Sequence, residues 1–259
     1  MNLYSDTLAV GSGSLVGFSL GLIGGGGSIL ATPLLLYVVG VAPPHAAIGT
    51  GALAVAANAF LNFSNYARRG VVRWRSAVIF AVVGSIGAFA GSSIGKAVNG
   101  DWLLFLFGLL MLAVGALMLR PRRSVVLPEK KESDRSWVAG GTALAVGLAA
   151  GFFGIGGGFL IVPGLVFATG MPMINAIGTS LLAVGAFGLT TALNYAASGL
   201  VDWTVAFEFI SGGFIGGLIG MRLASHLSQF KSALNLVFAS LIFVVAIYIL
   251  YKSGRTILA

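Results

Sequence analysis

The most informative feature of this 259-residue chain is what it lacks. It has no cysteine, which excludes disulfide bonds, thiolate metal ligands and a cysteine nucleophile. Only 8% of its residues are charged, against about 25% in a typical soluble domain. With two histidines, seven acidic residues and no HExxH motif, little remains for a metal site or for acid–base catalysis. We therefore expect no metal, no cofactor and no enzymatic activity.

Basic residues are absent from the start of the chain and clustered further on. Residues 1–7 hold no Lys or Arg, whereas a cleaved signal peptide begins with basic residues, so we expect this segment to remain in the fold. The net charge of +8 comes largely from clusters at 68–75 and 120–135, between apolar runs. This placement follows the positive-inside rule for cytoplasmic loops. The clusters do not form a basic face lined by stacking aromatics, so we expect no nucleic-acid partner.

Apolar residues dominate the rest of the chain. Hydrophobic residues make up 58% of it, in runs that include several long enough to cross a bilayer as helices. The sequence therefore predicts an all-α polytopic membrane protein whose partner is a lipid bilayer. The apolar runs cover roughly residues 8–23, 28–40, 45–66, 76–98, 102–119, 137–154, 158–170, 174–196, 204–226 and 231–251.

A glycine-rich motif occurs twice. GLIGGGGSILATP at 21–33 recurs 130 positions later as GFFGIGGGFLIVP at 151–163. The chain is therefore an internal duplication, which is common among secondary transporters. Further copies follow each motif at a shift of 129 residues: AIGT at 47–50 and 176–179, and NYA at 65–67 and 194–196.

The duplication predicts two homologous halves, 1–119 and 137–259, around a polar cytoplasmic linker at 120–136. Residues 8–40, taken as one continuous helix, would be about 50 Å long, whereas the hydrocarbon core of a bilayer is about 30 Å thick. The glycines must therefore interrupt this helix. A re-entrant hairpin or two thin crossings would invert the second half relative to the first. A single crossing would give four spans per half and parallel repeats. The N-terminus without basic residues favours inversion, as does the loop at 68–75, whose second copy lacks the arginines.

Each glycine break is a candidate anion site. The N–H groups that open the half-helix after a break have no intrahelical partner and carry partial positive charge. Glycine also lets a ligand approach the backbone closely. Tight helix packing is the alternative explanation, but consecutive glycines that recur with a proline at one offset favour binding; Pro33 and Pro163 are assigned structural roles. The candidate ligands are Gly24, Gly25, Gly26, Gly27 and Ser28 in the first copy and Gly154, Gly156, Gly157 and Gly158 in the second.

A polar stripe follows each motif and is expected to line the same cavity. Polar side chains in a membrane helix face the bundle or a water-filled cavity, although hydrogen bonding between helices is the alternative role. Helical spacing places the members of each stripe on one face. They are Thr50, Asn58, Asn62 and Asn65 in the first half and Thr179, Ser180, Thr191 and Asn194 in the second, where Phe187 replaces Asn58.

His45 and Arg222 are the candidates for a gate or for ion coupling. His45 follows Pro44 at a span entrance and can titrate near neutral pH. Arg222 is the best-placed cation for meeting an anion, while Lys96 is expected to snorkel to the interface. Two glycine rows at a spacing of four are assigned to helix packing: Gly87, Gly91 and Gly95, and Gly212, Gly216 and Gly220.

The paired motifs, with the AIGT and NYA segments that follow them, resemble the sulfite exporter TauE/SafE family, also called the toluene sulfonate uptake permeases. The resemblance covers nearly the whole chain, including the duplication and the polar linker. Gly25 opposite Ile155, and Ser28 opposite Gly158, are departures between the copies. The residues that match the family motif are Gly24, Gly26, Gly27 and Pro33, and Gly154, Gly156, Gly157 and Pro163.

The resemblance implies a multi-pass carrier in the cytoplasmic membrane of a prokaryote. Its substrates would be small sulfur-containing anions such as sulfite, sulfonates including sulfoacetate, or thiosulfate. We expect the anion to be held between the two glycine breaks and moved by alternating access. An anion channel, or a scaffold or accessory subunit without transport, remains as an alternative. The sequence leaves open the direction of transport, the coupling ion and the formation of a homodimer.

Overall fold

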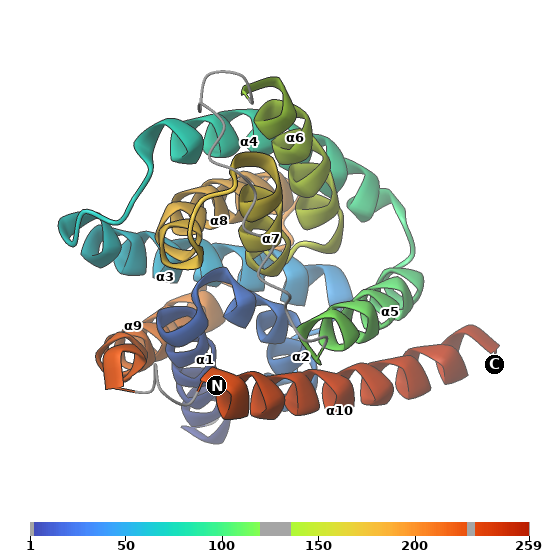
Figure 1. Cartoon of the computed structure of the whole chain (residues 1–259). Coiled ribbons are helices and arrows are strands. Elements are labelled where there is room, and N and C mark those ends of the chain that lie inside the picture. The colour runs from blue at the N-terminus through green and yellow to red at the C-terminus, as the bar shows by residue number, and fades with distance from the viewer. Residues whose placement is uncertain (1–2, 120–135, 227–230, 259) are drawn as a thin grey trace.

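The computed structural model is helical throughout the residues that it describes, 3–119, 136–226 and 231–258, and contains no strand there (Figure 1). The predicted linker lies outside these residues except for Ser136. The α-helices are α1 (Leu3–Ile23), α2 (Ala31–Leu34), α3 (Pro44–Arg68), α4 (Trp74–Ala97), α5 (Gly100–Leu119), α6 (Ser136–Phe153), α7 (Gly158–Thr169), α8 (Met173–Ala196), α9 (Trp203–His226) and α10 (Lys231–Leu258). A 3₁₀ segment, η1 (Gly24–Leu30), and a π-helical segment, η2 (Leu35–Val39), flank α2.

The all-α membrane fold predicted from the apolar runs is confirmed. The first and last helices extend beyond their runs, α1 by starting at Leu3 and α10 by ending at Leu258, because a helix can continue into the hydrated interface where polar residues are tolerated. Within the described residues, five helical segments are long and apolar enough to span a membrane by themselves: Pro44–Arg68, Trp74–Ala97, Ile174–Ala196, Trp203–Leu223 and Ala239–Ile257.

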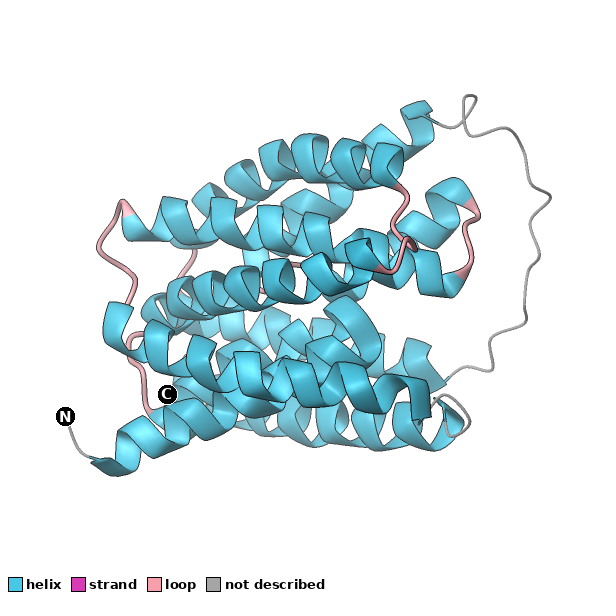
Figure 2. Cartoon of the chain, turned by 90° about the vertical axis from the view of Figure 1, so that its left-hand side faces the viewer, coloured by secondary structure: helices cyan, strands magenta, loops and turns pink. Residues whose placement is uncertain are grey.

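The helices lie roughly side by side, and both chain termini lie at one end of the bundle (Figure 2). We call this the termini end. The opposite end, where α3 finishes at Arg68 and α4 begins at Trp74, is called the arginine end. Each of the four tryptophans lies at or near the first residue of a helix and is at least 50% exposed. Trp74 and Trp137 lie at the arginine end and Trp102 and Trp203 at the termini end, which is the arrangement of the aromatic belts at two membrane interfaces.

The equivalent helices α3 and α8 pack together in the middle of the molecule (Figure 1). They run antiparallel, because the start of each lies against the end of the other. A Cβ atom on Gly49, near the start of α3, would meet Tyr195 and Leu200 at the end of α8. Its equivalent on Gly178, near the start of α8, would meet Tyr66 at the end of α3. The glycine of each AIGT motif therefore makes room for the tyrosine of the other half's NYA motif.

The outer helices pack across the two halves. Helix α1 lies along α9, and α6 lies along α4, each pair running in the same direction. Helices α5 and α10 pair antiparallel, and the hydroxyl of Ser253 donates to the carbonyl of Asp101. The glycine rows assigned to packing do lie in these contacts: Cβ atoms on Gly212, Gly216 and Gly220 would meet the α1 backbone, and those on Gly87, Gly91 and Gly95 the α6 backbone.

Both glycine breaks reverse the chain. After the first break, η2 returns along α1, and Gly27 lies against Ser19 and Leu20. After the second, α7 returns along α6, and a Cβ atom on Gly157 would meet Ala150. Each break therefore forms a hairpin rather than a kinked continuation. In the second hairpin Gly154, Gly156 and Gly157 all adopt left-handed φ angles of 62° to 67°, a conformation that glycine reaches without steric cost.

Candidate functional site

The two glycine breaks meet inside the bundle. Helix α7 packs against η1, and both contact α8. A Cβ atom on Gly156 would lie 3.0 Å from Val55 of α3 and 3.5 Å from Val184 of α8. These valines are equivalent residues of the two halves, 129 positions apart, and each lies five residues after the end of an AIGT motif. Gly156 therefore lies at the centre of the duplication, midway along the two antiparallel helices.

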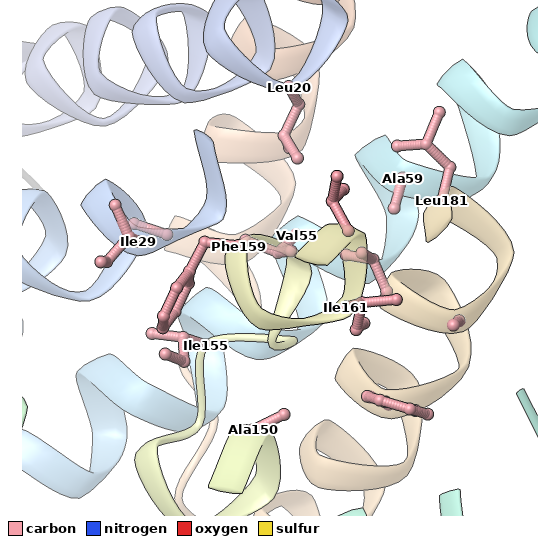
Figure 3. Packing of buried hydrophobic residues seen from close by; sticks show 14 of the residues in the cluster. Leu20, Ile29, Val55, Ala59, Ala150, Ile155, Phe159, Ile161 and Leu181 are labelled. Atoms are coloured by element: carbon pink, nitrogen blue, oxygen red, sulfur yellow. The ribbon is translucent and has the colours of Figure 1, made fainter. Parts of the chain in front are cut away.

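Apolar side chains fill the space around this meeting point. Ile29 of η1, Ile155 of the second break and Phe159 of α7 are buried there beside Val55 (Figure 3). These side chains lie at the place where the sequence predicts a cavity between the breaks, and that cavity stays a prediction. Gly24 to Ser28 form most of η1, with Ser28 fully buried, and Gly158 begins α7.

The prolines of the two motifs occupy the returning arms of the hairpins. Pro33 is buried in α2, and Pro163 lies inside α7. Pro163 has no N–H to donate to the carbonyl of Phe159, so α7 lacks one of its internal hydrogen bonds. The structural role assigned to these prolines stays a prediction.

A polar groove begins one helical turn from the centre and leads toward the arginine end. It lies between α3 and α9 and has a volume of about 10 Å³, which is room for about one water molecule. Asn58 and Asn62 are buried, and each donates one amide hydrogen to the carbonyl four residues earlier, at 3.0 Å in both cases. One further N–H of each amide is left for a ligand. The main walls are Asn58, Asn62 and Asn65 on α3 and Gly213, Gly217 and Met221 on α9.

Two glycines give the groove its width. A Cβ atom on Gly213 would collide with the amide of Asn58, and one on Gly217 would lie 3.2 Å from the amide of Asn62. Asn58 Oδ1 is buried without a hydrogen-bond partner among the described residues. A buried acceptor of this kind beside free N–H groups suits a water or a ligand that both donates and accepts.

The equivalent place between α8 and α4 is closed. Phe187 replaces Asn58, and a Cβ atom on Gly84, the counterpart of Gly213, would collide with its ring. One turn further along α8, Thr191 is fully buried, and its hydroxyl has no partner among the described residues. The stripe ends at Asn194, at the termini end.

The two polar stripes therefore do not line one shared cavity. Asn62 faces α9 toward the arginine end, whereas Asn194 hydrogen-bonds to α4 at the termini end. The reason is the antiparallel packing of α3 and α8, which sends equivalent faces toward opposite ends of the bundle.

Asn194 belongs to a hydrogen-bonded cluster with Lys96 of α4. The ammonium of Lys96 donates to Asn194 Oδ1 and to the Asn194 carbonyl, each at 2.8 Å, and to Ser198 Oγ at 2.9 Å. The Asn194 amide in turn donates to Ser92 Oγ at 2.7 Å and to Ser93 Oγ at 3.0 Å. These contacts join the ends of α4 and α8.

The threonines of the two AIGT motifs, and Ser180 beside the second, form hydrogen bonds with the backbone. Thr50 Oγ1 accepts from the backbone N–H of Asp202 at 2.9 Å, and Thr179 Oγ1 accepts from that of Arg73 at 3.0 Å. Asp202 and Arg73 are equivalent positions, each directly before the first residue of a helix. Ser180 donates to the carbonyl of Ile177 at 2.8 Å.

The two candidate gating residues lie at opposite ends. His45 starts α3 at the termini end, where its Nε2 lies 3.1 Å from the Val98 carbonyl. Arg222 is exposed near the end of α9 and directly follows Met221, which lines the groove. Within the described residues, no cluster of three His, Cys, Asp or Glu side chains could hold a metal ion.

The sequence did not single out three residues that lie beside the two polar stripes, Gly213, Gly217 and Lys96. Gly213 and Gly217 were not distinguished from the packing row, although the double glycines at 212–213 and 216–217 present one residue to α1 and the next to α3. Lys96 was expected to reach toward the interface, but it bonds to a residue 98 positions away. No local pattern identifies such a partner.

Comparison with known proteins gives a family match over nearly the whole chain. The family described as "Sulfite exporter TauE/SafE" matches residues 9–249. A "Probable membrane transporter protein" of Xylella fastidiosa (strain 9a5c) is 58% identical over 261 aligned positions, with all of both chains covered. The "Probable membrane transporter protein YunE" of Bacillus subtilis (strain 168) is 27% identical over 241 positions, covering 85% of this chain and 88% of the relative. No solved structure matches.

Proposed function

Because the chain belongs to the sulfite exporter TauE/SafE family, we propose that this multi-pass membrane transporter carries small sulfur-containing oxyanions by alternating access. Sulfite, small sulfonates such as sulfoacetate, and thiosulfate are the substrates to test. The family and the names of the relatives indicate a transporter rather than an enzyme.

The observation that carries the proposal is the difference between two equivalent grooves. The groove between α3 and α9 has room for about one water molecule beside Asn58 and Asn62, whereas Phe187 fills the equivalent place between α4 and α8 and Lys96 joins those two helices at the termini end. A carrier that exposes a central site to one side at a time needs one path open while the other is closed. Exchange of the two states would move the site from one end to the other.

The helix directions support inverted repeats. In a parallel duplication the equivalent spans cross the membrane in the same direction, and in an inverted one they cross in opposite directions. The antiparallel contacts of α3 with α8 and of α5 with α10 favour inversion. We assign residues 1–119 and 137–259 to the two repeats, with the polar linker between them.

The charges support a cytoplasmic arginine end. Among the described residues, Lys96, Lys252 and Arg255 lie toward the termini end, whereas Arg68, Arg69, Arg73 and Arg75 lie at the arginine end. Basic residues favour the cytoplasmic side of a membrane, so the termini end would face outward from the inner membrane of a prokaryote. The proposed path lies within one chain, so a homodimer would carry two paths.

The groove offers neutral hydrogen-bond donors. The second N–H groups of Asn58 and Asn62 can bind oxyanion oxygens, and the amide and glycine lining carries no formal charge. The unpaired N–H groups at the start of α7 can contribute partial positive charge near the centre. Neutral donors hold an anion less tightly than a buried arginine would, which allows its release.

The test is counterflow of radiolabelled sulfite, thiosulfate and sulfoacetate in proteoliposomes of the purified protein. Asn62→Leu removes a groove donor and should lower the rate by roughly tenfold, because hydrogen bonds to charged groups are among the stronger ones. Ser64→Ala changes an exposed hydroxyl on the same helix and should leave the rate unchanged.

Counterflow also separates the alternatives. Saturable exchange supports a carrier, whereas single-channel currents would support an anion channel. No transport of any anion, with no anion-dependent change in thermal stability, would contradict the proposal and favour an accessory subunit.

A further inference from the structure

We infer that Lys96 forms a second oxyanion site at the termini end, which keeps the path between α4 and α8 closed until an anion displaces its internal hydrogen bonds. This inference rests on the proposed transport function and identifies where the anion would engage the closed side. The evidence is the contact set of Lys96, the composition of its surroundings and the contrast with the duplicated position.

The hydrogen bonds of Lys96 join two helices that must separate for the closed groove to open. An ammonium group has three donors, and all three bond to residues at the end of α8 or directly after it: the Asn194 side chain, the Asn194 carbonyl and the Ser198 hydroxyl. Lys96 itself lies in the last turn of α4. Helices α4 and α8 are therefore tied together at the termini end through one side chain.

No carboxylate neutralises this ammonium within the described part of the chain. All three acceptors are uncharged, and the ammonium also lies 5.9 Å from the centre of the uncharged Tyr195 ring. The Asn194 amide donates to the hydroxyls of Ser92 and Ser93. A positive charge held only by neutral groups binds an anion more strongly than it binds those groups, because charge-assisted hydrogen bonds between opposite charges are the stronger kind. Lys96 is half-buried and Ser93 exposed, so the cluster is reachable from outside the bundle.

An oxyanion offers acceptors that can replace those of α8. Its oxygens can take the ammonium hydrogens now given to Asn194 Oδ1 and Ser198 Oγ. The Ser198 hydroxyl, which then no longer accepts from Lys96, can donate to the same anion. Replacement of the α8 acceptors by the oxygens of the anion would hold the anion and at the same time release α4 from α8.

The duplication shows that this tie is a feature of one end only. The position equivalent to Lys96 in the second half is Ser225, which carries no charge. The corresponding groove, between α3 and α9, is the one with room for a water molecule. The charged side chain therefore occurs on the side that is closed.

The cysteine-free chain allows a direct test with a single reporter. Thr191→Cys lies on α8 one turn inside Asn194 and is buried, and the lost hydroxyl has no partner among the described residues. Its reaction with a membrane-impermeant maleimide, applied from the termini end in proteoliposomes, reports opening of the α4–α8 path.

Lys96→Met should raise the labelling rate by about tenfold, as expected for the loss of a charge-assisted contact. Lys252→Met is the matched control, because Lys252 lies near the same end but contacts the Tyr37 ring and not α8. Sulfoacetate, whose sulfonate does not add to the maleimide as sulfite would, should raise labelling in the chain that retains Lys96 and leave it unchanged with Lys96→Met. Circular dichroism and gel filtration check that each variant is folded.

Equal labelling with and without Lys96→Met overturns the inference, whatever the transport assay gives. Labelling that no anion of the panel changes overturns the assignment of an oxyanion as the ligand. The inference stands if Lys96→Met raises labelling, if Lys252→Met does not, and if sulfoacetate raises labelling only in the chain that retains Lys96. It would stand even if no anion crossed the membrane, a result that would contradict the proposed transport by itself.

Discussion

The hydroxyl oxygen of Thr50 accepts a hydrogen bond from the backbone N–H of Asp202, 2.9 Å away and 152 positions later in the chain. In the duplicated pair, Thr179 of the second half accepts from the backbone N–H of Arg73 in the first half, so the two halves exchange roles. The threonine of each AIGT motif therefore fixes the start of a helix that belongs to the other half. This reciprocal contact explains the duplication of AIGT without assigning the two hydroxyls to the substrate.

We expect Thr50→Val to destabilise the protein by about 1 kcal/mol, because valine keeps the shape but leaves the Asp202 N–H without its acceptor. For a chain of this size the melting temperature should fall by roughly 2–4 °C. Thermal unfolding in detergent measures it, with Thr50→Ser as the control that keeps the hydroxyl. Identical melting of the Val and Ser variants would show that the contact does not matter for stability.

The contact between α1 and α9 depends on glycine at Gly17. A Cβ atom there would collide with the backbone of Gly213, so Gly17→Ala should cost about 1–3 kcal/mol through overpacking. Gly11→Ala, on the same helix and with open space around it, should be neutral or slightly stabilising because alanine favours the helix. Equal thermal stability of the two variants would contradict the packing.

The turn at the second break depends on Gly156. Its φ of 62° is left-handed, which costs a residue with a Cβ atom about 1–2 kcal/mol, and the added methyl would press on Val55. Gly156→Ala should therefore lower both the melting temperature and the rate of anion counterflow. Gly141→Ala in α6, where nothing lies near the added atom, controls for the substitution itself.

The orientation of the repeats can be tested at one pair of equivalent positions. Arg68 and Ala197 are 129 residues apart, and both are exposed at helix ends. In inverted repeats, Arg68→Cys and Ala197→Cys should react with an impermeant maleimide from opposite sides of the membrane. Reaction from the same side would instead support parallel repeats. The chain has no native cysteine to confuse the result.

Local features of the sequence were sufficient for the helices and the breaks. Apolar runs placed α3 and α8 to within two residues at each end, because lipid requires a continuous hydrophobic span. The consecutive glycines of the second motif marked the reversal at Gly156, where residues with side chains would be strained. The spacing of Asn58 and Asn62 correctly placed both on one helix face, since that depends only on the helical period.

The sequence by itself determined the class of protein, the duplicated halves and the residues that interrupt the helices, because composition and periodicity act over one or two turns. Only the tertiary structure decided that α3 and α8 run antiparallel, that the polar stripes lead to opposite ends, and that Lys96 reaches Asn194. These relationships join residues about a hundred or more positions apart. They depend on how whole helices pack, and the pattern within a single helix carries no record of its partner.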